Sequence, residues 1–101
     1  MEQKGRLGMD FVTKEDSICL EDASGAVIAG VFFLPRSENI VEITSTQVDS
    51  SLRGQGVADR LLTALAEKLR ADGLKAIPTC SYAAKWFLNH PEYADITHPQ
   101  L

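Results

Sequence analysis

The sequence predicts one mixed α/β domain, in which antiparallel strands are followed by a β-α-β crossover and a short C-terminal helix. In the first half, β-branched residues alternate with polar residues, which is the period of a strand. After residue 56, apolar residues recur at spacings of three and four, which is the period of a helix. The 101 residues have room for one core, so any cleft is formed by that core or completed by another subunit.

Three extended regions are expected in the first half. The first region shows short apolar/polar alternation over residues 9–13 and 18–20 and is interrupted by a charged bend. Residues 22–25 form a turn signal, and residues 26–34 form a continuous apolar run, typical of a strand buried on both faces. Residues 40–48 alternate with period two. Unless a bulge shifts the phase, one face of that strand carries Ile40, Glu42, Thr44, Thr46 and Val48.

The second half begins with the clearest helix of the sequence. Its apolar positions run from Val57 to Leu69, and Gly73 stops it. Residues 75–79 form a short strand, and residues 81–89 form a second helix, with Ser81 as its expected N-cap. The long helix therefore connects two neighbouring strands, which places it over the sheet.

Composition excludes several classes of function. The net charge of −4 repels phosphate backbones, so a nucleic-acid partner is not expected. The longest apolar run is too short to span a membrane, and the N-terminus shows no apolar signal core, so a cytoplasmic location is expected. Cys19 and Cys80 do not have the spacing of metal ligands, so free thiols and no bound metal are expected.

The loop between residues 48 and 57 predicts an anion site. Gly54 and Gly56 allow the backbone to approach a ligand closely, and the first amides of the following helix have no partner within the helix. Those amides, the helix dipole and Arg53 favour a phosphate or diphosphate. The loop lacks the G-K-[ST] of a P-loop, and the third glycine of a dinucleotide fingerprint falls at Asp59. The alternative is a tight turn that needs two flexible residues.

This loop resembles the R/Q-x-x-G-x-G/A motif of the GNAT acetyltransferase superfamily. Arg53, Gly56 and Ala58 match its first, fourth and sixth positions. Together with further segments, the motif resembles the minimal single-domain GNAT-like subfamily over residues 10 to 96, approximately, within a single domain 1–101. The further segments are Thr46–Val48, Gly73–Lys75, Pro78–Tyr82 and His90–Tyr93.

The resemblance implies an acetyl-CoA-dependent N-acetyltransferase that acts on an unidentified amine or protein acceptor. Strands 40–48 and 75–79 would splay apart, and the pantetheine arm would pair with the backbone at Thr46 and Val48. The pyrophosphate would be bound by the loop residues Arg53, Gly54, Gln55, Gly56, Val57 and Ala58. Members of this subfamily lack the elements that wall the acceptor site in full-size acetyltransferases. The alternative is therefore a non-catalytic acetyl-CoA-binding or interaction module, monomeric or weakly dimeric through an exposed sheet edge.

Cys80 is the first catalytic candidate, because it directly precedes a helix N-terminus, a position that lowers the pKa of a thiol. It would accept the acetyl group or lie against the thioester sulfur; the alternative is a small buried apolar residue. Cys19 lies in a strand and is expected in the core. Some relatives carry a histidine immediately before the matched threonine, where this chain has Ser45, so no base is inferred there.

Three further residues are catalytic candidates, each with a structural alternative. His90 would act as a general base, or bind the last carbonyls of the helix before it. Tyr93 would donate a proton to the departing CoA thiolate, or pack as an aromatic side chain. Glu42 would activate the acceptor amine if its face lines the cleft, or face solvent.

Overall fold

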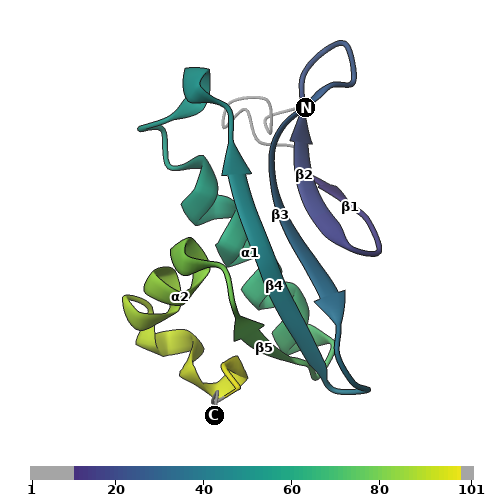
Figure 1. Cartoon of the computed structure of the whole chain (residues 1–101), viewed down its shortest axis with the longest axis vertical. Coiled ribbons are helices and arrows are strands. Elements are labelled where there is room, and N and C mark those ends of the chain that lie inside the picture. The colour runs from purple at the N-terminus through teal and green to yellow at the C-terminus, as the bar shows by residue number, and fades with distance from the viewer. Residues whose placement is uncertain (1–10, 99–101) are drawn as a thin grey trace.

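The computed structural model describes residues 11–98, which form a single five-stranded sheet with two α-helices (Figure 1). The strands lie side by side in chain order, β1 to β4 antiparallel and β5 parallel to β4. The elements are β1 (Val12–Thr13), β2 (Ser17–Glu21), β3 (Val27–Pro35), β4 (Ile40–Val48), α1 (Val57–Ala71), β5 (Lys75–Pro78) and α2 (Ser81–Leu88). Two 3-10 segments, Ser50–Leu52 and Pro91–Ile96, complete the described chain. Neither α1 nor α2 is long and apolar enough to cross a membrane.

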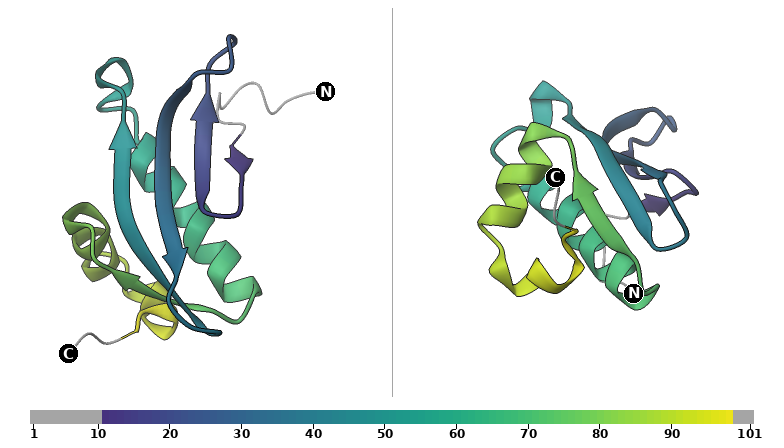
Figure 2. Two further views of the ribbon diagram at one scale, coloured as in Figure 1. Left: turned by 45° about the vertical axis from the view of Figure 1, so that its right-hand side comes forward. Right: turned by 60° about the horizontal axis from the view of Figure 1, so that its bottom comes forward.

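Helix α1 supplies the centre of the core. Its apolar positions form one stripe, so the helix lies along the sheet with that stripe against β2, β3 and β4 (Figure 2). The leucines of the stripe are almost wholly excluded from solvent: Leu61, Leu62, Leu65 and Leu69. Because the helix is fixed by this packing, its N-terminus is held beside the end of β4.

Strand β3 corrects the expectation of burial on both faces. Ala29, Val31 and Phe33 face α1 and are buried, whereas Val27 and Leu34 are each 49% exposed. On the second face, the Phe32 ring folds over Gly30, where an added Cβ would lie 3.0 Å from a ring carbon. A continuous apolar run therefore does not imply two covered faces here, because α1 covers only one.

A bulge in β4 corrects the expected facing of its second half. Ile43 pairs with Phe33 and Ser45 pairs with Phe32, so Thr44 has no partner of its own in β3. Before the bulge, Val41 and Ile43 are buried in the core. After it, Thr46 and Val48 lie on that same side of the sheet, so the strand does not keep one alternation from end to end.

The ends of several helices and strands differ by one or two residues from the ends that the sequence predicts. Cys80, and not Ser81, is the N-cap of α2. Trp86 and Phe87 are buried as expected, and so is Cys19 in β2. Of the strand expected at residues 9–13, only Val12 and Thr13 form a strand, while residues 9 and 10 lie outside the described part.

Candidate functional site

Strands β4 and β5 separate after four paired residues. Their pairing runs from Ile40 beside Lys75 to Ile43 beside Pro78. The N–H groups of Thr79 and Cys80 then both donate to the carbonyl of Ile43, at 3.1 and 3.0 Å, and the chain turns into α2. Beyond this point, β4 continues to Val48 without a strand beside it on that edge. The separation opens the sheet directly below the N-terminus of α1.

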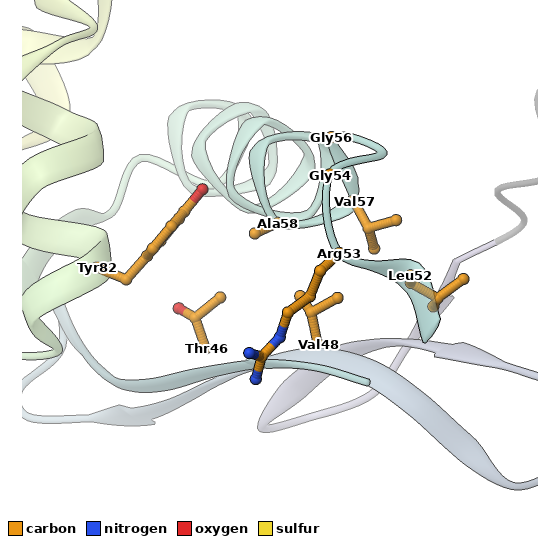
Figure 3. A pocket seen from close by; sticks show the side chains of 9 residues that line it. All are labelled: Thr46, Val48, Leu52, Arg53, Gly54, Gly56, Val57, Ala58 and Tyr82. Atoms are coloured by element: carbon orange, nitrogen blue, oxygen red, sulfur yellow. The ribbon is translucent and has the colours of Figure 1, made fainter. Parts of the chain in front are cut away.

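A cavity of about 500 Å³ occupies this opening (Figure 3). Seven of the eight residues predicted to hold the cofactor line it, and so do Leu52 and Tyr82. The predicted residues that line it are Thr46, Val48, Arg53, Gly54, Gly56, Val57 and Ala58. Figure 3 shows Arg53 extending from the loop toward β4, with Leu52 and Tyr82 on opposite sides of the cavity. Contact of these residues with a ligand stays a prediction.

Gln55 is the predicted residue that does not line the cavity. Its side-chain amide donates to the carbonyl of Ser51 at 3.2 Å, and its backbone N–H donates to Leu52 at 3.3 Å. Tyr82 was missed because an exposed tyrosine in the first turn of a short helix carries no sequence signal. It enters the site only because β5 ends early and brings α2 against the cavity.

The glycine loop leaves backbone donors free at the cavity. Gly54 and Gly56 have φ values of 82° and 75°, in the left-handed region where other residues are strained. Within residues 11–98, the N–H groups of Gly54, Gly56, Val57 and Ala58 donate to no other protein group. The helix dipole adds partial positive charge at the same place. This end of the cavity is therefore built to accept an anion.

The Cys80 thiol is not among the residues that line the cavity, but it contacts one that is. Its Sγ is 3.6 Å from the hydroxyl oxygen of Thr46. Partial burial raises the pKa of Cys80, but hydrogen bonds from the Ala83 N–H, the Thr46 hydroxyl and other backbone N–H groups lower it by more. The net pKa of the thiol is below its ordinary value, because these donors favour the thiolate.

Replacement of Thr46 by valine is expected to raise the pKa of Cys80, since valine keeps the shape but removes the hydroxyl that stabilises the thiolate. At neutral pH the thiolate fraction falls, so alkylation by iodoacetamide slows. Intact-mass measurements of alkylation against pH test this, because Cys19 is only 1% exposed and stays unmodified in the folded protein. Thr63→Val is the control, since its hydroxyl donates to Asp59 in α1. An unchanged pH profile in Thr46→Val would contradict the assignment.

His90 is not among the residues that line the 500 Å³ cavity. Its Nδ1 donates to the carbonyl of Trp86 at 2.7 Å, and its ring stacks on the Trp86 ring with centroids 4.0 Å apart. Its Nε2 is 3.4 Å from the Asp59 carboxylate. This placement favours the alternative of a histidine that binds the end of its helix.

Tyr93 and Glu42 also lie outside the cavity lining. The Tyr93 hydroxyl donates to Glu67 at 2.6 Å, and this carboxylate raises the pKa of the phenol, while Arg70 stacks over the ring. The Glu42 carboxylate is 3.5 Å from Arg36 across the hairpin of β3 and β4. Both side chains have partners that account for their positions, so their catalytic roles have no support in the geometry.

Potential metal ligands do not gather in the described part of the chain: no three His, Cys, Asp or Glu side chains of residues 11–98 are close enough to hold an ion. The cavity instead combines free backbone donors, one guanidinium and an apolar floor. That combination suits an extended organic anion.

Comparisons with known proteins agree with this geometry. A GCN5-like protein from Staphylococcus aureus, solved in solution, matches with a TM-score of 0.77 and 27% identity over 92% of this chain and 91% of that one. A GNAT-family N-acetyltransferase from Escherichia coli in complex with CoA matches with a TM-score of 0.55 and 26% identity. That match covers 61% of this chain but only 38% of the E. coli protein.

A more distant structure shares the fold. A protein from Mycobacterium tuberculosis in complex with CoA has a TM-score of 0.61 at 19% identity, over 76% of this chain and 48% of that one. A search of curated protein sequences finds no match. The family model described as GCN5-related N-acetyl-transferase matches residues 18–96. This match spans the sheet from β2 onward, the glycine loop and both helices, so the chain belongs to the GCN5-related N-acetyltransferase family.

Proposed function

We propose that this protein is an acetyl-CoA-dependent N-acetyltransferase. The observation that carries the proposal is the cavity of about 500 Å³ between the free edge of β4 and the glycine loop. It offers oriented N–H donors at the glycine loop, and its lining residue Thr46 contacts a thiol of lowered pKa. The CoA-bound relatives support the ligand, and acetyl-CoA is the acyl donor we infer from the family.

Two parts of the cavity suit two parts of acetyl-CoA, the diphosphate and the pantetheine arm. The diphosphate would accept hydrogen bonds from the N–H groups of Gly54, Gly56 and Val57, with Arg53 adding charge. The pantetheine arm carries amides, so it suits the unpaired edge of β4 near Thr46 and Val48. This orientation directs the thioester toward Thr46 and Cys80.

In the proposed reaction, Cys80 acts as the nucleophile. Its thiolate attacks the thioester carbonyl, the new bond forms between Sγ and the acetyl carbon, and the bond to the CoA sulfur breaks. CoA leaves as a thiolate and takes up a proton. An acceptor amine then attacks the acetyl-Cys80 thioester, loses a proton and leaves as the amide, which restores the thiol. The N–H of Thr46, which contributes to the lowered pKa of the thiol, would stabilise the oxyanion of either step.

Titration of the isotope-labelled protein with acetyl-CoA tests the ligand. We expect the largest amide shifts at Gly54, Gly56 and Val57, because their N–H groups change from solvent to phosphate partners. Smaller shifts are expected along β4 at Thr46 and Val48. Silence at all of these positions at saturating ligand concentration would reject the proposal.

The covalent route makes a separate prediction. Intact mass after incubation with acetyl-CoA and without acceptor is expected to show one added acetyl group. The adduct is expected to vanish in Cys80→Ala and to persist in Cys19→Ala, because Cys19 is buried in β2 and cannot reach the cavity. An adduct that survives in Cys80→Ala, or acetyl transfer to amines without any adduct, would contradict the role of Cys80.

A second candidate is a module that binds acetyl-CoA without turnover. The observation in its favour is that His90, Tyr93 and Glu42 are each held by partners outside the cavity lining. A panel of small amines and basic peptides, with thiol release as the readout, separates the two candidates. Release that depends on the amine supports the enzyme, whereas saturable binding with no release over the whole panel supports the module.

A further inference from the structure

A second groove, of about 380 Å³, lies beside the cofactor cavity, between α1 and α2. The two hollows share one wall, Tyr82, whose side chain is half exposed. The other residues that line the groove are Asp59, Lys85, Trp86, Asn89 and His90. The groove and the cavity therefore lie next to each other, on the two sides of Tyr82.

On one side of the groove, the lining side chains contact one another. The indole Nε1 of Trp86 donates to Asp59 at 2.7 Å, and His90 lies 3.4 Å from the same carboxylate while stacking on the indole. The indole N–H thus partly compensates the negative charge of Asp59. This side forms a fixed aromatic floor.

The other side carries groups without protein partners. Among residues 11–98, the Lys85 ammonium makes no ion pair, and the side chains of Tyr82 and Asn89 make no hydrogen bond. Arg53, at the cofactor cavity, likewise makes no ion pair within this range. Each hollow therefore has one free cation of its own, separated by the Tyr82 wall.

Two adjacent hollows with one free cation each suit the chemistry of CoA, which has two separate anionic groups. One is the diphosphate, and the other is the 3′-phosphate on the ribose of the adenosine. We propose that the groove between α1 and α2 holds the adenosine 3′-phosphate end of CoA, and that Lys85 makes the protein prefer CoA over 3′-dephospho-CoA. This inference rests on the proposed function, since it assumes that CoA occupies the cavity.

The expected preference is modest because Lys85 is exposed. An exposed ion pair contributes at most about 1 kcal/mol, which corresponds to about a fivefold difference in Kd. The preference also falls as salt is added, because the pair is screened. Asn89 and the Tyr82 ring are available to the base and ribose, but these contacts are the same for both ligands.

The experiment compares the Kd of CoA and of 3′-dephospho-CoA at low salt. Quenching of the single tryptophan, Trp86, is one readout because it lines the groove, and calorimetry is the second. The variants are Lys85→Gln, Lys85→Arg and, as a matched control, Lys68→Gln, whose ammonium pairs with Asp72 on α1 instead.

Wild type, Lys85→Arg and Lys68→Gln are expected to bind CoA about fivefold more tightly than 3′-dephospho-CoA. Lys85→Gln is expected to bind both equally, with the affinity for 3′-dephospho-CoA unchanged. Equal binding of both ligands by wild type, or a preference that survives in Lys85→Gln, overturns the role of Lys85. Failure of wild type to bind either ligand is a different result: it rejects the proposed function, and this inference falls with it.

Discussion

Replacement of Gly56 by valine is expected to weaken acetyl-CoA binding by at least about a hundredfold, the equivalent of losing one or two charge-assisted hydrogen bonds. Gly56 is the residue before the first turn of α1, and its φ of 75° directs the neighbouring N–H groups into the cavity. A Cβ at this position meets no protein atom within 4 Å, so its bulk projects into open space beside these donors. Valine there competes with the diphosphate.

The control for Gly56→Val is Gly73→Val, at the opposite end of the same helix. Gly73 has a φ of 73°, and a Cβ there also meets no protein atom within 4 Å. Both variants therefore carry the same backbone strain of about 1–2 kcal/mol, but only one of them faces the cavity. Calorimetric titration of both variants below their unfolding temperatures measures the difference. Equal losses of affinity, or undiminished binding by Gly56→Val, would contradict the anion site.

Replacement of Leu65 by alanine is expected to destabilise the protein by about 3 kcal/mol, because it leaves a cavity between α1 and the sheet. Leu65 is wholly excluded from solvent in the centre of the apolar stripe of α1. Alanine is an excellent helix former, so the loss comes from packing and not from the helix itself. A domain of this size has a total stability of about 5–15 kcal/mol, so the variant stays folded with a melting temperature lower by about 10–25 °C.

The matched control is Leu88→Ala in α2, where the leucine is 82% exposed. This change is expected to alter the free energy of unfolding by less than about 0.5 kcal/mol. Urea unfolding, followed by circular dichroism, measures both variants. If Leu65→Ala unfolds at the urea concentration of wild type, the packing of α1 against the sheet is wrong.

The sequence predicted α1 and β4 well because each carries one uninterrupted period. The helix stripe from Val57 to Leu69 and the β-branched run from residue 40 to 48 both form where expected. The bulge at Thr44 was not predictable, because it is defined by the pairing with β3, and no residue type at that position requires it. The N-cap of α2 was placed one residue late, because Cys80 takes this position next to a serine, which is the commoner N-cap residue.

The sequence predicted the part of the site that one local segment forms, and it missed the part that depends on packing between distant segments. The glycine loop is local, so its place in the cavity lining follows from Gly54, Gly56 and the start of the helix. Tyr82 comes from a different part of the chain, so the path of β5 decides its place. The partners of Tyr93 and Glu42, which are Glu67 and Arg36, depend on how segments distant in sequence meet.

The bulge in β4 divides the strand into two stretches whose inward-facing side chains have different surroundings. The residues before Thr44 fill the interior beneath α1, and the residues after it face the hollow that we assign to the cofactor. Without the bulge, strict alternation along the same sequence would turn Thr46 and Val48 to the other face, and Ser45 and Gln47 would take their places. The bulge at Thr44 thus lets one strand contribute core residues along its first stretch and cavity-lining residues along its second.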